Sequence, residues 1–154
     1  MNLVVREMRP EDAEQVAAMV RGLASHLGRE EVPKVTREAL NGNRDLIDVV
    51  VAEQDGKLIG ACLTLMTFST WRGVKGLYVV DLFVEQQARG NKTGFHLLKL
   101  AASRGMARGA QFIKLEVDYT NERAAQFYEK LGFKRKDLDR LFILEREEFK
   151  SFVK

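Results

Sequence analysis

The residues best suited to bind an anion stand in the turn Arg89-Gly90-Asn91-Lys92-Thr93-Gly94. The turn joins an apolar run over residues 77–84, which is typical of a buried strand, to a helical pattern over residues 95–108. Backbone N–H groups at the start of a helix are unpaired and lie at the positive end of the helix dipole. The two glycines let a ligand approach the backbone closely, and the arginine and lysine add positive charge. The turn therefore indicates a phosphate site, with an ordinary strand-to-helix connection as the alternative.

Two known phosphate-binding motifs can be compared with this turn, and neither fits. Asn91-Lys92-Thr93 is similar to the end of a P-loop, but Gln86 and Asn91 stand where that motif needs glycines. A dinucleotide-binding fingerprint needs three spaced glycines, which residues 90–94 do not supply. The predicted anion site therefore depends on the helix start and the basic residues.

A second pattern lies in residues 121–133. Its apolar positions repeat at helical spacing, which on periodicity alone predicts a stripe facing the core: Ala124, Phe127, Tyr128 and Leu131. Thr120 or Asn121 can cap this helix, and Gly132 stands where a left-handed residue often ends one. The segment is thus expected to be a short helix that follows a strand.

Together the two segments resemble the GNAT superfamily of N-acetyltransferases. Residues 89–94 are similar to its cofactor motif Arg/Gln-x-x-Gly-x-Gly/Ala, with Lys92 where the family has its middle glycine. Residues 121–133 are similar to its downstream motif Asn-x-x-Ala-x-x-Phe-Tyr-x-x-x-Gly-Phe. The resemblance implies acetyl-coenzyme A (acetyl-CoA) as the co-substrate. It also implies these cofactor-binding residues: Leu82, Phe83, Val84, Arg89, Gly90, Asn91, Lys92, Thr93, Gly94, Phe95, Asn121, Ala124 and Tyr128.

The chemistry that this resemblance implies is direct attack of a neutral amine on the acetyl thioester. Tyr128 is the expected proton donor to the departing thiolate, since a thiol has a pKa near ~8.5 and a tyrosine near ~10. Glu116 is the first candidate for the base that deprotonates the amine. Asp81 is the second, because an acid within an apolar run is costly to bury unless it is paired or used. Backbone N–H groups near Phe83 and Val84 are expected to meet the oxyanion.

Both Asp81 and Tyr128 have a structural alternative. Tyr128 could be a core aromatic residue, and Asp81 could make a structural hydrogen bond to a neighbouring loop.

A finer resemblance links residues 68–73 and the strand after them to the diamine (spermidine/spermine) acetyltransferase branch. It implies that the acceptor is a primary amine of a small molecule, either a polyamine or an amino-acid-like compound. The candidate acceptor-binding residues are His26, Trp71, Tyr78 and Asp81. A non-catalytic acetyl-CoA sensor and an enzyme acting on a protein or peptide amine remain as alternatives. Homodimers are common in the superfamily, so a homodimer is a further expectation.

These residues need a framework, and the hydrophobic pattern predicts one α/β domain over residues 1–154 with a mixed central sheet flanked by helices. An Asp-Gly pair between two β-type runs predicts a hairpin at residues 54–56. The expected strands cover residues 3–9, 47–53, 57–68, 77–84 and 112–117, followed by two closing strands, one from Phe133 onward and one over 141–144. Helices are expected to start at Pro10, near Thr36, near Phe95 and near Asn121.

Composition narrows the classes of function. The net charge of +3 arises from 25 basic and 22 acidic residues that are interspersed along the chain, which argues against a nucleic-acid binder. No apolar run is long enough to cross a membrane, and the first residues lack a signal-peptide pattern. Cys62, the one cysteine, is expected to be a buried small side chain, and with His26 and His96 it forms no metal-ligand pattern. The sequence therefore predicts a cytoplasmic protein without metal, membrane or nucleic-acid partners.

Overall fold

The computed structural model describes residues 2–27 and 32–154. The chain forms two compact units, Met1–Glu116 and Val117–Lys154. In the described residues the first unit carries the β-sheet and three α-helices, and the second carries two α-helices.

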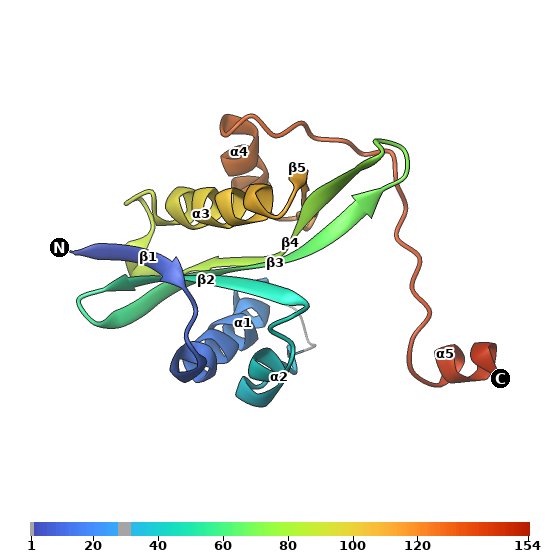
Figure 1. The fold of residues 1–154 in the computed structure, drawn as a ribbon, viewed down its shortest axis with the longest axis horizontal. Coiled ribbons are helices and arrows are strands. Elements are labelled where there is room, and N and C mark those ends of the chain that lie inside the picture. The colour runs from blue at the N-terminus through green and yellow to red at the C-terminus, as the bar shows by residue number, and fades with distance from the viewer. Residues whose placement is uncertain (1, 28–31) are drawn as a thin grey trace. The chain divides into compact units, whose positions relative to one another are not determined.

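The first unit is built on a five-stranded sheet with the order β1-β2-β3-β4-β5 (Figure 1). Its strands are β1 (Leu3–Glu7), β2 (Ile47–Gln54), β3 (Lys57–Ser69), β4 (Val74–Val84) and β5 (Ala110–Lys114). Neighbours run antiparallel from β1 to β4, whereas β5 runs parallel to β4. A parallel pair needs a crossover connection, and helix α3 (Thr93–Ala107) supplies it. The predicted α/β fold with a mixed sheet is confirmed.

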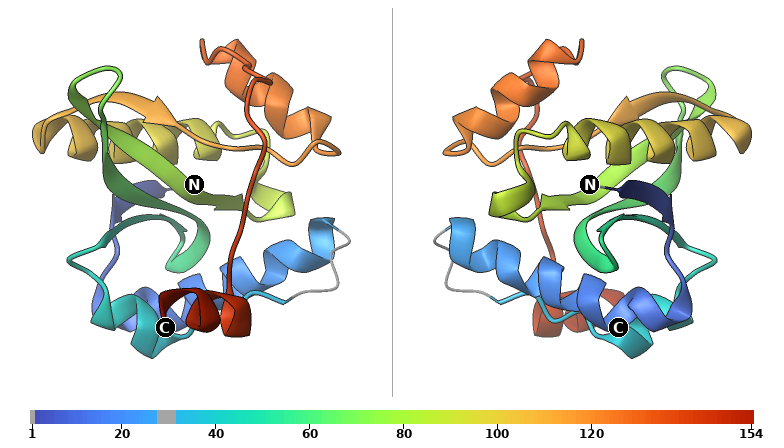
Figure 2. Two further views of the ribbon diagram at one scale, coloured as in Figure 1. Left: turned by 90° about the vertical axis from the view of Figure 1, so that its right-hand side faces the viewer. Right: turned by 90° about the vertical axis from the view of Figure 1, so that its left-hand side faces the viewer.

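Helices cover both faces of this sheet. Helices α1 (Ala13–Leu27) and α2 (Arg37–Gly42) lie on one face, and α3 lies on the other (Figures 1 and 2). A 3₁₀ turn (Pro10–Asp12) leads into α1, and Thr36 caps α2 by accepting a hydrogen bond from the Ala39 N–H at 3.1 Å. The main hydrophobic core lies between α1, α2 and the sheet. The three predicted helices of this unit are thus present.

The turn between β2 and β3 matches its predicted hairpin chemistry. Asp55 and Gly56 have φ angles of 52° and 82°, so both are left-handed, as a type I′ turn requires. Gln54 pairs with Lys57 on either side of the turn. The predicted hairpin is therefore confirmed, with Gln54 paired in β2 and only Asp55 and Gly56 in the turn.

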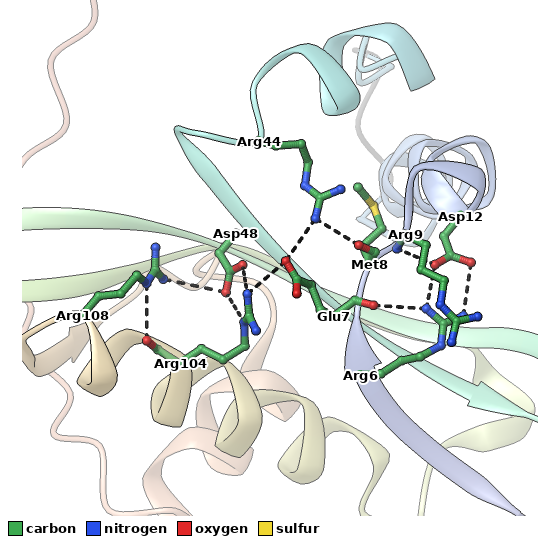
Figure 3. A network of polar contacts seen from close by, with 9 residues as sticks. All are labelled: Arg6, Glu7, Met8, Arg9, Asp12, Arg44, Asp48, Arg104 and Arg108. Carbon is green, nitrogen blue, oxygen red and sulfur yellow. Dashed lines mark hydrogen bonds and ion pairs between the residues drawn. The ribbon is translucent and has the colours of Figure 1, made fainter.

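Ion pairs hold α3 against the sheet (Figure 3). Arg104 of α3 donates to both carboxylate oxygens of Asp48 in β2, at 2.7 and 2.8 Å, and lies 3.2 Å from the Glu7 carboxylate. The Arg104 guanidinium keeps the pKa of Asp48 below its ordinary value despite the burial of that carboxylate. A bidentate pair of this kind fixes orientation as well as charge. The network therefore positions α3, and with it the turn at its N-terminus.

The second unit contains α4 (Glu122–Lys130) and α5 (Arg146–Val153). Asn121 caps α4, because its side-chain oxygen accepts a hydrogen bond from the Ala124 N–H at 3.2 Å. Gly132 follows the helix with a φ of 103°, in the left-handed conformation that a helix end favours. Both predictions for this helix are confirmed.

Two sequence predictions about the C-terminal part are wrong. Residues 133–145 form no strand in the structure, which describes all of them, and residues 146–153 form a helix that was not predicted. A strand is stable only when a neighbour pairs with its backbone, and alternating apolar residues do not by themselves supply that neighbour. The helix had a readable signal, since Glu147 and Glu148 stand in its first turn and Lys150 in its last.

Candidate active site

Strand β4 loses one of its two neighbours halfway along its length. It pairs with β5 only through Lys75, Leu77 and Tyr78. Residues 79–84 pair with β3 alone among the described residues, so their other edge has no partner strand. An unpaired edge presents backbone N–H and C=O groups to any ligand that lies beside it. This open edge of β4 is the first component of the candidate site.

A β-bulge lies where β4 and β5 separate. Leu63 of β3 pairs with Asp81 and Thr64 pairs with Val79, so Val80 is an extra residue in β4. Val80 is consequently exposed, although the sequence predicted a strand covered on both faces. Bulges often re-aim side chains next to active sites.

The direction of the N–H groups along the open edge follows from one hydrogen bond. The Glu85 N–H donates to the Ile59 carbonyl of β3 at 2.8 Å. Because successive N–H groups of an antiparallel strand point to opposite edges, those of Val84 and Leu82 point to the open edge. This alternation favours Leu82 and Val84, rather than Phe83, as donors to an oxyanion.

The bulge places Tyr78 and Asp81 on the same face of β4. Leu77 packs on Gly105 of α3, so Tyr78 faces the opposite side, toward α1. Phe83 belongs to the core beneath α1, and Asp81, two residues earlier, shares that face. The sequence alone could not show that Tyr78 and Asp81 share a face, because two residues that stand three positions apart in a regular strand point to opposite faces.

Asp81 is a half-buried carboxylate to which no described side chain donates a hydrogen bond. Burial raises its pKa from the ordinary value of 3.8 to about 6. A carboxylate with a pKa in this range is a stronger base than an exposed one and still ionises at neutral pH. Such perturbed groups concentrate at functional sites.

Tyr78 interacts electrostatically with both Asp81 and Glu116. The Tyr78 hydroxyl donates a hydrogen bond to Glu116. Burial raises the pKa of Tyr78, and the charge of Glu116, this hydrogen bond and the charge of Asp81 raise it further. Glu116 itself is exposed and lies two residues beyond β5, not within a strand as predicted. The structure thus brings Asp81, Tyr78 and Glu116 into one electrostatic cluster.

Cys62 is close to this cluster but chemically inert. It is fully buried, and burial, with the charges of Asp81 and Asp48, raises its pKa to about 12. The sequence prediction of a buried, unreactive cysteine is confirmed.

The turn at residues 89–94 has the geometry of an anion site. Helix α3 starts at Thr93 and no side chain caps it, so its first N–H groups remain available. The Thr93 hydroxyl is buried and has no hydrogen-bond partner in the described part of the chain, which is rare for a buried polar group. Arg89 donates through its Nε to the Val84 carbonyl at 3.2 Å. The uncapped N–H groups and the Thr93 hydroxyl fit a ligand with several acceptor oxygens.

Lys92 shows why this position usually carries glycine. Its φ is 59°, in the left-handed region, and Gly90 two residues earlier has a φ of 98°. A residue with a Cβ pays roughly 1–2 kcal/mol in this conformation. The departure from the motif is therefore tolerated at a cost in stability and without loss of the backbone geometry.

The strain at Lys92 can be measured with two substitutions. Lys92→Gly and Lys92→Ala both remove the ammonium group, but only glycine also relieves the left-handed backbone. We expect the glycine variant to exceed the alanine variant in free energy of unfolding by about 1 kcal/mol, measured by urea denaturation. Equal stability of the two variants would contradict a left-handed conformation at this position.

In the second unit, α4 carries the predicted residues Ala124 and Tyr128, and the predicted residue Asn121 is its N-cap. The Tyr128 ring is half-buried and packs edge-to-face against Phe127 and Phe133, with centroids 5.2 and 5.4 Å away. The cap interaction of Asn121 uses its side-chain oxygen. The role of these three residues toward a cofactor stays a prediction.

The remaining residues that the sequence predicted for the site, Trp71, His26 and Phe95, are not part of the Asp81 cluster in the described structure. Trp71 is 98% exposed at the tip of the β3–β4 hairpin, and seven residues of extended strand separate Val74 from Asp81, roughly 23 Å. The hairpin tip is therefore not part of the Asp81 cluster. The side chain of His26 lies outside the described residues. Phe95 is half-buried in the first turn of α3 and stacks edge-to-face on His96.

Two predicted absences, of a metal site and of a membrane-spanning segment, can be examined in the described residues. No group of three His, Cys, Asp or Glu side chains there could hold a metal ion. No helix within the same residues is long and apolar enough to span a membrane.

The first unit thus combines an open strand edge, a bulge beside a half-buried acid and an uncapped helix start. The sequence profile described as the acetyltransferase (GNAT) family matches residues 15–133, a range that includes parts of both units. The chain belongs to this family.

Curated relatives and solved structures agree with this assignment. Thialysine N-epsilon-acetyltransferase from Bos taurus is 27% identical over 142 residues, which cover 84% of this chain and 83% of the bovine protein. N-alpha-acetyltransferase 30 from Schizosaccharomyces pombe is 32% identical over 104 residues, covering 67% and 69% of the two chains. An integron cassette protein from the mobile metagenome of V. cholerae has the same fold, with a TM-score of 0.80 over 100% of this chain and 99% of its own, at 18% identity.

Proposed function

We propose that this acetyltransferase transfers the acetyl group of acetyl-CoA to a primary amine of a small molecule, with Asp81 as the general base. The observation that carries the proposal is the half-buried Asp81 carboxylate, with its pKa raised to about 6, beside the open edge of β4. Glu116, the first candidate from sequence, is exposed and hydrogen-bonded to Tyr78. It is better placed to orient Tyr78 and an incoming cation than to act as the base.

The proposed binding mode of the co-substrate uses the same unit. The uncapped start of α3 and the buried Thr93 hydroxyl suit the pyrophosphate oxygens, and Lys92 adds positive charge. The pantetheine arm carries amide groups, which can pair with the open edge of β4 as an added strand does. The thioester would then lie near the N–H groups of Leu82 and Val84.

Transfer needs a neutral amine, because an alkylammonium with a pKa near ~10.4 has no free lone pair. Asp81 accepts the proton of the amine directly or through a water molecule, and the amine then attacks the thioester carbon. The N–H groups of Leu82 and Val84 stabilise the negative charge on the carbonyl oxygen. Collapse of this intermediate breaks the carbon–sulfur bond, and Tyr128 is the proposed proton donor to the leaving thiolate.

The charge of the cluster supports a cationic acceptor. Asp81 and Glu116 contribute two negative charges around the Tyr78 ring, and no described basic side chain pairs with either of them. A ligand cation is attracted by both carboxylates and by the face of an aromatic ring. Relatives named for thialysine acetylation make a lysine-like or diamine side chain the first class to test.

The test is an acceptor panel assayed by release of the coenzyme A thiol. It compares thialysine, a diamine, a peptide with a free N-terminus and a reaction without acceptor. We expect turnover with thialysine or the diamine to exceed that with the peptide by at least about 10-fold. Turnover mainly with the peptide would favour a protein-directed enzyme. Binding of acetyl-CoA without transfer to any acceptor would favour a sensor and overturn the proposal.

A further inference from the structure

Strand β5 brings a lysine to the face of the sheet that carries Asp81 and Tyr78. The register of β5 with β4 pairs Leu77 with Ile113 and Tyr78 with Lys114. Residues that are paired in neighbouring strands point to the same face, and Tyr78 faces away from α3 because Leu77 faces toward it. The side chain of Lys114 therefore stands beside Tyr78, one strand away, within the first unit.

The ring of Phe112 supports this assignment of faces. A Cβ added to Gly76 would overlap the Phe112 ring, so the ring covers this glycine. Gly76 shares its face with Tyr78, which stands two residues later in β4. Phe112 in turn shares its face with Lys114, two residues later in β5. Arg72 stacks on the same ring at 4.7 Å, so Lys114 is accompanied by a second cation.

Lys114 and Glu116 place opposite charges next to Tyr78 without pairing with each other. Among the described residues of the first unit, the Lys114 ammonium makes no ion pair with any acid. Glu116 instead accepts a hydrogen bond from the Tyr78 hydroxyl. An ammonium and a carboxylate that remain separate can each bind the opposite group of a ligand. This arrangement matches the head group of an amino acid, which carries an ammonium and a carboxylate on one carbon.

The separation between Lys114 and Asp81 suits a lysine-like acceptor. Asp81 follows Tyr78 by three residues, one of which is the bulge residue Val80, so the two lie roughly 7–10 Å apart along β4. The step across to Lys114 in the neighbouring strand adds roughly 5 Å in the perpendicular direction. The extended chain of lysine from its α-carbon to its terminal nitrogen spans roughly 6 Å. The reach of the Lys114 and Asp81 side chains covers the remaining distance.

We propose that Lys114 binds the carboxylate of the acceptor, so that the enzyme prefers an amino acid with a side-chain amine over a diamine of the same length. Asp81 receives the amine at one end, and Lys114 with Glu116 holds the zwitterionic group at the other. A diamine brings a second ammonium to the same place, where Lys114 and Arg72 repel it. This inference rests on the proposed function, because it concerns the acceptor of that site.

A matched set of acceptors tests this preference in the native enzyme. Thialysine and bis(2-aminoethyl) sulfide differ only in the carboxylate, and thialysine methyl ester keeps a group of similar size without the negative charge. Release of the coenzyme A thiol should give a kcat/KM for thialysine at least about 10-fold above that of either other compound. An equal or higher value for the diamine or the ester would overturn this inference and leave the acetyltransferase function in place. No turnover with any of the three amines would overturn both.

Variants of Lys114 provide the second measurement. Lys114→Glu should reverse the order and favour the diamine, and Lys114→Gln should bring the two values to within about 3-fold of each other. The change should appear in KM rather than in kcat, because the contact is made equally in the ground state and the transition state.

Lys75→Gln is the matched control for these variants. Lys75 lies in the same paired stretch of β4 and β5, but its side chain lies beside Gly109, on the face that carries α3. Its substitution should leave the preference for thialysine as it is in the native chain. An unchanged preference in Lys114→Glu, or an equal loss in Lys75→Gln, would contradict the proposed role of Lys114.

Discussion

Replacing Asp81 by Asn is expected to lower kcat/KM for the amine acceptor by about 10²–10⁴-fold, the range that a positioned general base contributes. The amide has nearly the shape of the carboxylate but cannot accept the proton of an ammonium group. Steady-state release of the coenzyme A thiol at pH 7.5 measures the effect. Asp45→Asn, the same change at an exposed position of the first unit, should leave kcat/KM unchanged. Glu116→Gln should act more weakly than Asp81→Asn, and the reverse order would move the base to Glu116.

The pH profile gives an independent signature of Asp81. Its pKa of about 6 means that the carboxylate loses its proton, and so becomes a base, as the pH rises through this value. In the native enzyme kcat/KM should therefore rise with a limb near pH 6. This limb should be absent in Asp81→Asn, whereas a purely structural carboxylate would leave the shape of the profile unchanged.

The same substitution should stabilise the folded protein. Burial raises the folded-state pKa of Asp81 above its unfolded value of 3.8, so folding favours the protonated form. The contribution of this group to stability is fully present below pH ~4 and is lost as the pH rises through about 6. After allowance for solvent screening, Asp81→Asn should gain about 1–2 kcal/mol in free energy of unfolding at pH 7.5 and nothing near pH 4. Urea denaturation at both pH values measures this difference, and a loss of stability at pH 7.5 would show that Asp81 makes favourable structural contacts.

Much of the fold follows from local signals in the sequence. The Asp55-Gly56 turn, the Thr36 and Asn121 caps and the left-handed Gly132 each depend on residues within a few positions, which a sequence displays directly. The prediction of two closing strands was wrong because strand pairing depends on a neighbour far away in the chain, which periodicity does not specify.

The candidate site likewise contains some features that the sequence predicts and others that it does not. The turn at residues 89–94 could be predicted because helix starts and glycines have local consequences. The sequence ranked Glu116 ahead of Asp81 as the base, and the proposed reversal of that order depends on burial, which the whole first unit determines. The bulge at Val80 was also hidden, although it is the reason that Asp81 and Tyr78 share a face. A one-residue insertion in a strand does not change the composition of the chain and changes the hydrophobic periodicity of the strand only slightly.

Tyr128→Phe is expected to lower kcat by about 10²-fold while KM for the acceptor changes little, because a proton donor acts mainly in the transition state. The substitution keeps the ring that packs on Phe127 and Phe133, so the fold of the second unit should be retained. The chain has three tyrosines, and the other two provide matched controls. Tyr119→Phe removes a hydroxyl from a side chain that is 88% exposed and should have no effect. Tyr78→Phe removes the hydrogen bond to Glu116 and should raise KM more than it lowers kcat. Unchanged turnover in Tyr128→Phe would leave this residue with the role of a packed aromatic ring and would assign the thiolate proton to water.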